Sequence, residues 1–316
     1  MPPPSLLDNI LQILLNGIAS GAVYGLFALG YTLVFSVLGV INFAHGAVFT
    51  LGAYLTYLLI GGAVGSNGLF PGLHLPFALP YWIALLLAAG LTALVGLLVE
   101  ATAFRPLRRF EAEPLLYLIT SLGAGVILVN LMQIVMGAEG YSLPISALGS
   151  LPVTVRIGEA QVRTVQLVLL AVAALVLLLL TVWLELTRGG KALRAVAEDA
   201  TTARLLGIDS AAMIRLSFAI SGFLAGLSGG LVGLSLSITG PYFGINYGLK
   251  ALGVLVLGGL GSVPGAVLGG LIIGIAEAMV PGDWSGYRDA IAYAFLFAVL
   301  LLRPRGLLGG PQETKV

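Results

Sequence analysis

Side chains that could do covalent or metal chemistry are scarce in this chain. The sequence has no cysteine, and its two histidines, His45 and His74, stand far apart, so neither thiolate chemistry nor a histidine metal cluster is expected. The segment GGK at 189–191 has Glu185 where a phosphate-binding loop needs its first glycine, and Ala192 where it needs Ser or Thr. We therefore expect no catalytic site, no metal and no cofactor bound by this chain, and interpret it as a non-enzyme.

Charged side chains gather in one island, residues 188–215, with the sequence RGGKALRAVAEDATTARLLGIDSAAMIR. The island holds five of the 15 basic residues and three of the 14 acidic residues, in a chain of which only 9% is charged. Apolar residues recur in it at helical spacing and predict a short amphipathic helix over about 191–207. The apolar stripe consists of Leu193, Val196, Ala197, Ala200 and Ala203.

The rest of the island fits a helix with defined ends. Arg194 and Glu198 are four residues apart and are expected to pair on one face. Gly207 is placed to end the helix. Asp209 or Ser210 can cap the helix that follows.

Two interpretations of this helix differ in what it touches. A helix lying on lipid headgroups usually carries Lys and Arg on its polar face and bulky anchors on the other. This one has alanines instead of Trp or Phe, and its polar side includes Glu198 and Asp199. Small apolar residues suit insertion into a groove of a protein, so we favour a docking helix for a soluble partner.

The composition of the whole chain excludes an ordinary soluble domain. Hydrophobic residues make up 59%, the mean hydropathy is +1.06, and no Lys, Arg, Asp or Glu occurs from Asn9 to Val99. The apolar runs are continuous and about 20 residues long, which is typical of transmembrane helices rather than of alternating barrel strands. We predict an all-α, polytopic transmembrane helical bundle in contact with membrane lipid. The net charge of +1 gives no reason to expect a nucleic-acid partner.

We expect about eight spans, with the first acting as an uncleaved insertion signal. They cover about 10–37, 44–63, 81–103, 114–137, 165–187, 213–238, a broken segment at 249–281, and 286–303.

Basic residues in short loops mark the cytoplasmic side of a membrane protein. They are Arg105, Arg108 and Arg109 after the third span, the island after the fifth, and Arg303, Arg305 and Lys315 after the last. The C-terminus is therefore expected in the cytoplasm, and 138–164 is expected to be an extracytoplasmic loop that could form a small hairpin.

The segment 249–281 must then cross an even number of times, or enter and return. The sequence GGLGSVPG at 258–265 breaks it, so we predict two short or re-entrant helices that meet at Ser262–Pro264. The same counting places the N-terminus outside. Glu277 is expected to form a structural ion pair with Arg288 or with Lys250.

Polar residues at membrane depth are candidates for a solute pathway or gate, because burying them in lipid is costly. Asn42, Phe43 and His45 lie in the turn NFAHG, which could line a pathway or could only satisfy freed backbone groups. Asn130 and Gln133 are three residues apart on one helix face. They could line a pore, although bonding to a neighbouring helix is favoured slightly.

Glycines repeat at a spacing of four, which lets helix backbones approach closely in lipid. They are Gly17, Gly21 and Gly25, then Gly222, Gly226 and Gly230, and Gly261, Gly265 and Gly269. A gate or a subunit interface is one interpretation. Packing within the subunit is the favoured one.

Several stretches resemble one family. KALRAVAEDATTARLLGID is similar to the coupling loop of LivH-type permeases of branched-chain amino acid ABC transporters. Residues 21–55, which contain NFAHG, resemble the first two spans of that family, 248–279 its penultimate region, and LLLRPRGLLGG its C-terminus. Residues 64–80 and 138–164 depart most.

The resemblance implies a single ABC transporter permease domain over residues 1–316, in a bacterial inner membrane. It implies a second homologous permease (LivM-like), two cytoplasmic ATPase subunits (LivG-like and LivF-like) that bind ATP and Mg, and an extracytoplasmic solute-binding protein. It places the coupling helix at 191–207. The ATPase contacts expected there are Arg194, Glu198, Asp199, Arg204, Leu206 and Gly207.

The resemblance also suggests the solute, which is a branched-chain or other neutral amino acid. Related permeases for urea or short amides are an alternative, although the acidic pair Glu198-Asp199 is closer to the amino-acid group. A channel or a secondary transporter that works without ATP is a further alternative. Neither would need residues 191–207 for energised uptake.

Overall fold

The computed structural model describes residues 6–149, 151–157, 160–303 and 306–309. The predicted all-α, polytopic architecture is confirmed for this part of the chain. The α-helices are α1 (Leu6–Leu38), α2 (His45–Leu59), α3 (Tyr81–Val99), α4 (Arg105–Arg109), α5 (Pro114–Met136), α6 (Thr164–Leu186), α7 (Arg188–Glu198), α8 (Ala200–Leu205), α9 (Ser210–Ser235), α10 (Phe243–Gly258), α11 (Val263–Ala278) and α12 (Arg288–Leu302).

Fewer helices than expected are long enough to cross a bilayer on their own. Among the described residues, five have the length and hydropathy of a span, and α10 with α11 can make a sixth. Helices α2 and α12, which lie in two of the eight expected spans, have 15 residues each. A helix of that length rises about 22 Å, which is short of the roughly 30 Å hydrocarbon core.

The predicted break in 249–281 is confirmed, but it lies slightly earlier than the expected Ser262–Pro264, because Val263 and Pro264 already belong to the first turn of α11. Helices α10 and α11 are bent by 119° at a break of four residues, Gly259–Ser262. Gly259 and Gly261 have φ of +107° and +80°, which glycine adopts without steric cost. The Ser262 side chain accepts a hydrogen bond from the Gly265 N–H at 3.1 Å and so caps α11.

The small hairpin predicted within 138–164 is also present. Strands β1 (Thr154–Ile157) and β2 (Ala160–Arg163) pair antiparallel, with Thr154 opposite Arg163. Upstream of the hairpin, a 3-10 turn covers Ile145–Leu148. Of the basic residues expected near the C-terminus, Arg303 ends α12, whereas Arg305 and Lys315 lie outside the described residues.

The chain forms two compact units. Unit 1 comprises Met1–Thr32, Pro152–Leu178 and Lys250–Val316, and unit 2 comprises Leu33–Leu151 and Leu179–Leu249.

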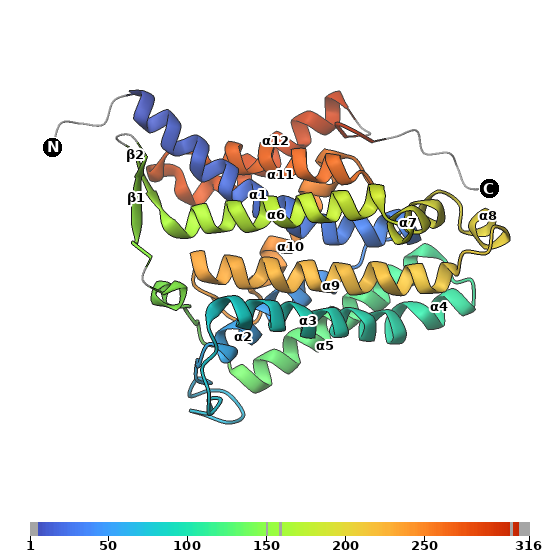
Figure 1. The fold of residues 1–316 in the computed structure, drawn as a ribbon, viewed down its shortest axis with the longest axis horizontal. Helices are drawn as coiled ribbons and strands as arrows, with labels where there is room; N and C mark the ends of the chain where they lie inside the picture. The colour runs from blue at the N-terminus through green and yellow to red at the C-terminus, as the bar shows by residue number, and fades with distance from the viewer. Residues whose placement is uncertain (1–5, 150, 158–159, 304–305, 310–316) are drawn as a thin grey trace. The chain divides into compact units, whose positions relative to one another are not determined.

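Unit 2 is built around the packing of α9 on α3 and α2, and Figure 1 shows α3 and α9 running side by side. The helices approach closely where small residues face each other. A Cβ on Gly222 would lie 2.5 Å from the Thr92 carbonyl oxygen, and one on Gly52 would lie 2.6 Å from that of Gly226. Gly230 faces Thr56 of α2 in the same way, and its carbonyl oxygen accepts a bond from the Tyr81 hydroxyl at 3.1 Å.

Unit 1 uses the same principle between α1 and α11. A Cβ on Gly17 would lie 2.7 Å from the Ile275 Cα, and one on Gly21 would lie 2.6 Å from the Gly270 carbonyl oxygen. Gly25 lies against Val267 with slightly more room, because a Cβ there would keep 3.4 Å from its Cα. These glycines therefore pack helices within the subunit.

The third glycine set is only partly a packing motif. A Cβ on Gly269 would lie 2.6 Å from the Val254 carbonyl oxygen, and one on Gly265 would lie 2.8 Å from the carbonyl carbon of Gly258, so both bring α11 against α10. The prediction for Gly261 is wrong. This residue lies in the turn between the two helices, where its positive φ explains the glycine.

Candidate functional site

The charged island folds into two helices rather than the one that was predicted over 191–207. Thr187 caps the start of α7, because its hydroxyl oxygen accepts a hydrogen bond from the Gly190 N–H at 3.0 Å. The chain is extended at Asp199 (φ −149°, ψ 108°), and α8 begins directly after it. The expectation of one continuous helix fails because Asp199 acts as an N-cap.

The cap at Asp199 is well formed. Its Oδ1 accepts hydrogen bonds from the Thr201 N–H at 2.8 Å and the Thr202 N–H at 3.2 Å. These are N–H groups of the first turn of α8, which a continuing helix would otherwise have to satisfy. Asp199 therefore has a structural role as well as an exposed position.

The far end of α8 has the expected geometry. Gly207 has a φ of +84°, and its N–H bonds to the Arg204 carbonyl at 2.9 Å. Of the two candidate caps of α9, Asp209 and Ser210, the structure uses Asp209, whose carboxylate accepts a hydrogen bond from the Ala212 N–H at 3.1 Å. The Ser210 hydroxyl instead donates to the Ala200 carbonyl at 3.1 Å and ties the start of α9 to α8.

The two helices have distinct buried and exposed sides. Leu193, Val196 and Ala203 of the apolar stripe are buried, and Ala197 and Ala200 are half-buried. All the expected ATPase contacts are exposed, namely Arg194, Glu198, Asp199, Arg204, Leu206 and Gly207. Leu205 was missed, although it is 84% exposed beside Leu206 at 76%. Two adjacent exposed leucines form an apolar patch on this surface, and such patches often mark interaction sites.

One expected pair does not form in this part of the described chain. Arg194 donates to the Glu185 carbonyl oxygen at 3.5 Å rather than to the Glu198 carboxylate. The guanidinium reaches back to the end of α6, where carbonyl groups lack helical partners. The carboxylate of Glu198 consequently stays exposed on the surface.

The NFAHG turn is held between two helices of unit 2. The Phe43 N–H donates to the Ser121 hydroxyl of α5 at 3.2 Å, and His45 Nδ1 lies 3.2 Å from the Ser221 hydroxyl of α9. Asn42 Oδ1 accepts from the Ala44 N–H at 3.1 Å, within the turn itself. Asn42 and His45 are 4% and 1% exposed, so both are buried polar groups with partners. The Asn42 bond matches the interpretation in which the turn satisfies freed backbone groups. The bonds of Phe43 and His45 go to other helices instead, and they join the start of α2 to α5 and α9.

Asn130 and Gln133 are not brought to that turn. Ser121, Gly125 and Val129 form the buried side of α5, whereas Asn130 lies on the exposed side and Gln133 is half-buried. The Asn130 amide donates to the Val126 carbonyl of its own helix at 2.8 Å. The favoured expectation of a bond to a neighbouring helix is therefore wrong for Asn130 within the described chain.

Glu277 pairs with Lys250, one of the two partners considered. The Lys250 ammonium lies 2.8 Å from Glu277 Oε1 and 2.7 Å from Asp289 Oδ1. The Tyr24 hydroxyl donates to Glu277 Oε2 at 2.7 Å. The pair lies in unit 1 and joins α1, α10, α11 and α12.

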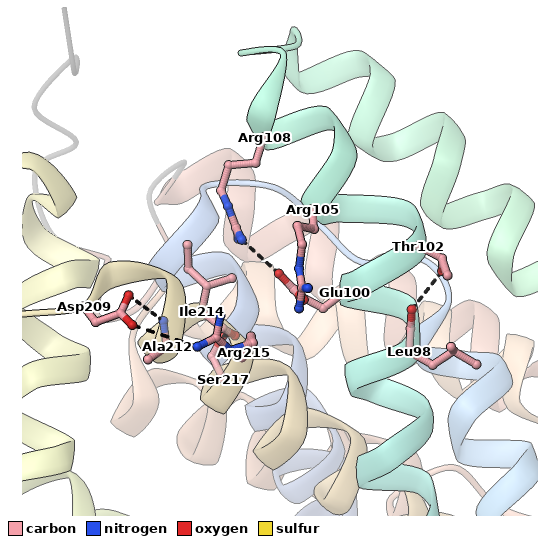
Figure 2. A network of polar contacts seen from close by, with 10 residues as sticks. All are labelled: Leu98, Glu100, Thr102, Arg105, Arg108, Asp209, Ala212, Ile214, Arg215 and Ser217. Atoms are coloured by element: carbon pink, nitrogen blue, oxygen red, sulfur yellow. Dashed lines mark hydrogen bonds and ion pairs between the residues drawn. The ribbon is translucent and has the colours of Figure 1, made fainter.

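Glu100 is a charged residue whose importance the sequence analysis missed. It follows α3 directly, begins a π-helix (Glu100–Phe104), and is fully buried. Its carboxylate accepts from Arg105 Nη2 at 2.8 Å and from Arg108 Nη2 at 3.0 Å (Figure 2). The available signal was its position as the first charged residue after Asp8, directly before the basic cluster.

The Glu100 cluster lies against the beginning of α9. The rings of Phe104 and Phe218 are 4.8 Å apart, and a Cβ on Gly96 would lie 2.5 Å from the Phe218 carbonyl oxygen. Figure 2 shows Arg215 and Asp209 of the same region, which are paired at 3.9 Å.

Comparisons with known proteins agree along nearly the whole chain. Residues 13–303 match the family model described as branched-chain amino acid transport system / permease component. The high-affinity branched-chain amino acid transport system permease protein LivH of Escherichia coli (strain K12) is 38% identical over 314 residues, which cover 97% of each chain. The corresponding permease protein BraD of Pseudomonas aeruginosa is 37% identical over 318 residues and 98% of each chain. Permease protein LivM of Salmonella typhimurium is 25% identical over 309 residues, which cover 90% of this chain and 68% of that protein.

Proposed function

The chain belongs to the family of permease components of branched-chain amino acid transport systems, and from that premise we propose that it moves branched-chain or other neutral aliphatic amino acids across the inner membrane. Members of this family are membrane subunits of ABC importers. The solute is inferred from the names of relatives that share 37–38% identity over nearly their full length.

We further propose that the surface formed by α7 and α8 receives a cytoplasmic ATPase subunit, which hydrolyses ATP in place of this chain. The observation that carries this proposal is the pair of exposed leucines, Leu205 and Leu206, at the C-terminal end of the short capped helix α8. The exposed charges of Glu198 and Arg204 flank them. An exposed apolar patch with a polar rim is typical of a protein interface. A cytoplasmic C-terminus follows from the same orientation.

The complete importer on this proposal contains a second, LivM-like permease, two ATPase subunits of the LivG and LivF types, and an extracytoplasmic binding protein. The similarity of this chain to a LivM permease protein supports a pair of two different but homologous permeases, because both can then share one fold. Asn42, Phe43 and His45 are proposed to move with the solute gate. Phe43 bonds to Ser121 of α5 and His45 to Ser221 of α9, so the turn connects α2 to both of these helices.

Co-purification of the full chain with its candidate ATPase subunits tests the docking proposal. The variants are Glu198→Arg and Leu206→Asp, which change exposed side chains and leave the Asp199 cap intact. Arg163→Glu is the matched control, because it is a charge reversal of an exposed residue at the other end of α6. We expect both docking variants to lose the ATPases and the control to retain them. ATPases that bind all variants equally would place the docking surface elsewhere.

Uptake of radiolabelled L-leucine into proteoliposomes tests the transport proposal. Uptake should require ATP, the ATPase subunits and the binding protein together. Leucine movement by this chain alone, without ATP, would instead support the channel or secondary-transporter alternatives.

A further inference from the structure

The buried carboxylate of Glu100 joins three consecutive segments of unit 2 into one body. Glu100 stands at the junction of α3 and the π-helix, and both arginines that bind it belong to α4. Glu100 is fully buried, whereas the side chains of Arg105 and Arg108 are 35% and 22% exposed. A carboxylate in this environment needs its cations, because an unpaired buried charge is strongly unfavourable. The position of α4 on α3 is thus set by ion pairs.

The cluster is poorly explained as a device for stability. Apolar side chains of similar volume often stabilise a core as well as a buried ion pair does, whereas ion pairs can favour one particular arrangement. In the described chain Arg108 Nη1 is buried and has no acceptor, so the cluster leaves one donor unsatisfied. The five-residue π-helix that begins at Glu100 is a second unusual feature of the cluster. Insertions of π-helix into α-helices are frequent at functional sites.

The position of the cluster connects it to the proposed docking surface. Helix α8 is tied to the start of α9 through the Ser210–Ala200 hydrogen bond. The first turns of α9 then pack on the π-helix through Phe218 and Phe104. A displacement of α8 that is passed on by α9 would therefore act on Phe104, which lies in the π-helix between Glu100 and the two arginines. These segments all belong to unit 2.

From the cluster the contact continues into the membrane-spanning part of unit 2. The antiparallel contact of α3 with α9 runs from Gly96 and Phe218 to Thr92 and Gly226. Packing this close leaves little room for the helices to slide, so α3 and α9 tend to move together. On the same helix α9, Ser221 contacts His45 of the NFAHG turn.

We propose that Glu100 is a positioning residue for energy coupling, which holds α4 on α3 so that a movement of α8 and α9 is passed to α3 as a rigid displacement. The proposal rests on the proposed function, because it requires an ATPase that docks on α7 and α8. Without the carboxylate, the ATPases still dock and hydrolyse ATP, but part of the displacement is lost in the π-helix and α4.

The test compares Glu100→Gln with the unchanged chain in proteoliposomes that contain the whole importer. The readout is the number of L-leucine molecules taken up per ATP hydrolysed, which a loss of folded protein alone does not change. We expect Glu100→Gln to keep ATP hydrolysis within about twofold and to lower leucine uptake about tenfold, a typical coupling effect. Glu113→Gln is the matched control, since this exposed acid lies directly before α5, and it should leave both rates unchanged.

Further variants guard against a folding defect. Glu100→Asp keeps the charge and should restore part of the ratio. Arg105→Gln leaves Glu100 paired with Arg108, so it should assemble even if Glu100→Gln does not, and it should lower the ratio by an intermediate amount. A ratio that stays unchanged in Glu100→Gln, or in Arg105→Gln if the former does not assemble, overturns the proposal. Failure of the unchanged importer to couple ATP to uptake would instead overturn the proposed function.

Discussion

The ammonium group of Lys250 lies 2.8 Å from the Glu277 carboxylate, and this contact joins the two arms of the bent pair α10–α11. Lys250 is in the first half of α10 and Glu277 is at the end of α11, so the ion pair closes the pair at the side opposite to its turn. Asp289 at the start of α12 binds the same ammonium group at 2.7 Å. A bend held only by its glycine turn would leave these ends free to separate.

The first prediction concerns this ion pair. Lys250→Met should destabilise the chain by about 3 kcal/mol, because Glu277 is then a buried carboxylate without its cation. The double variant Lys250→Met, Glu277→Gln should be more stable than the single variant, since the buried charge is gone. Thermal unfolding in detergent measures both. Asp289→Asn should cost less than about 1 kcal/mol because the Asp289 side chain is 60% exposed. Equal losses for all three variants would contradict this account.

The second prediction concerns the contact between α2 and α9. Gly52→Ala should destabilise the chain by at least about 2 kcal/mol, because the new Cβ would meet the Gly226 backbone, which cannot rotate away. Gly90→Ala and Gly123→Ala are controls on α3 and α5, since a Cβ at either position has nothing within 4 Å. These controls should be neutral or slightly stabilising. Thermal unfolding again provides the measurement, and a tolerated Gly52→Ala would show that the helices can separate there.

The third prediction concerns pH and the loop after α2. A 2.6 Å hydrogen bond from the Ser66 hydroxyl, with another from the Asn67 N–H, holds the pKa of the Glu139 carboxyl below its ordinary value of 4.5. A lowered pKa means that these bonds stabilise the loop above pH 4.5, and that the stabilisation is lost as the pH falls through the lowered pKa.

A spin label on Leu69→Cys can follow this transition, since the chain has no other cysteine. We expect the label to become more mobile as the pH falls below 4.5. In a Glu139→Gln background the mobility should no longer depend on pH in this range. A transition that persists in that background would have to come from another group.

Much of the architecture follows from the sequence because hydrophobic runs and glycine breaks act locally. The turn around Gly259 and Gly261 and the end of α8 at Gly207 were predictable, since a positive φ at these places requires little beyond the neighbouring residues. The orientation of α5 was not predictable, because its residues are apolar on both sides and no periodicity marks the side on which Asn130 lies. Glu100 was missed for a related reason. Its burial depends on two arginines that reach back from α4, and a sequence does not show that a charge near a helix end is buried.

At Asp199 the sequence contains two conflicting signals, a continuous apolar stripe and an N-cap residue, and the prediction of one helix followed the stripe. The stripe from Leu193 to Ala203 fits one helix, yet an aspartate such as Asp199 also fits the N-cap of a new helix start. The structure takes the second pattern, because the carboxylate satisfies two N–H groups at once. The proposed docking surface thus consists of two short helices, α7 and α8, separated by the extended residue Asp199.

The last prediction separates the cap from the charge at this position. If Asp199 acts by capping α8, Asp199→Asn should keep the affinity for the ATPase subunits, because asparagine caps a helix equally well. Asp199→Ala should lose about 1 kcal/mol of helix stability, and with it about fivefold in affinity, since α8 has only six residues and must be formed to bind. Binding of the purified ATPase subunits to the immobilised full chain measures both. Glu198→Gln is compared with Asp199→Asn, because it removes a neighbouring negative charge at a residue that does not cap α8. If Asp199→Asn loses as much affinity as Asp199→Ala, the carboxylate charge itself contacts the partner and the cap is secondary.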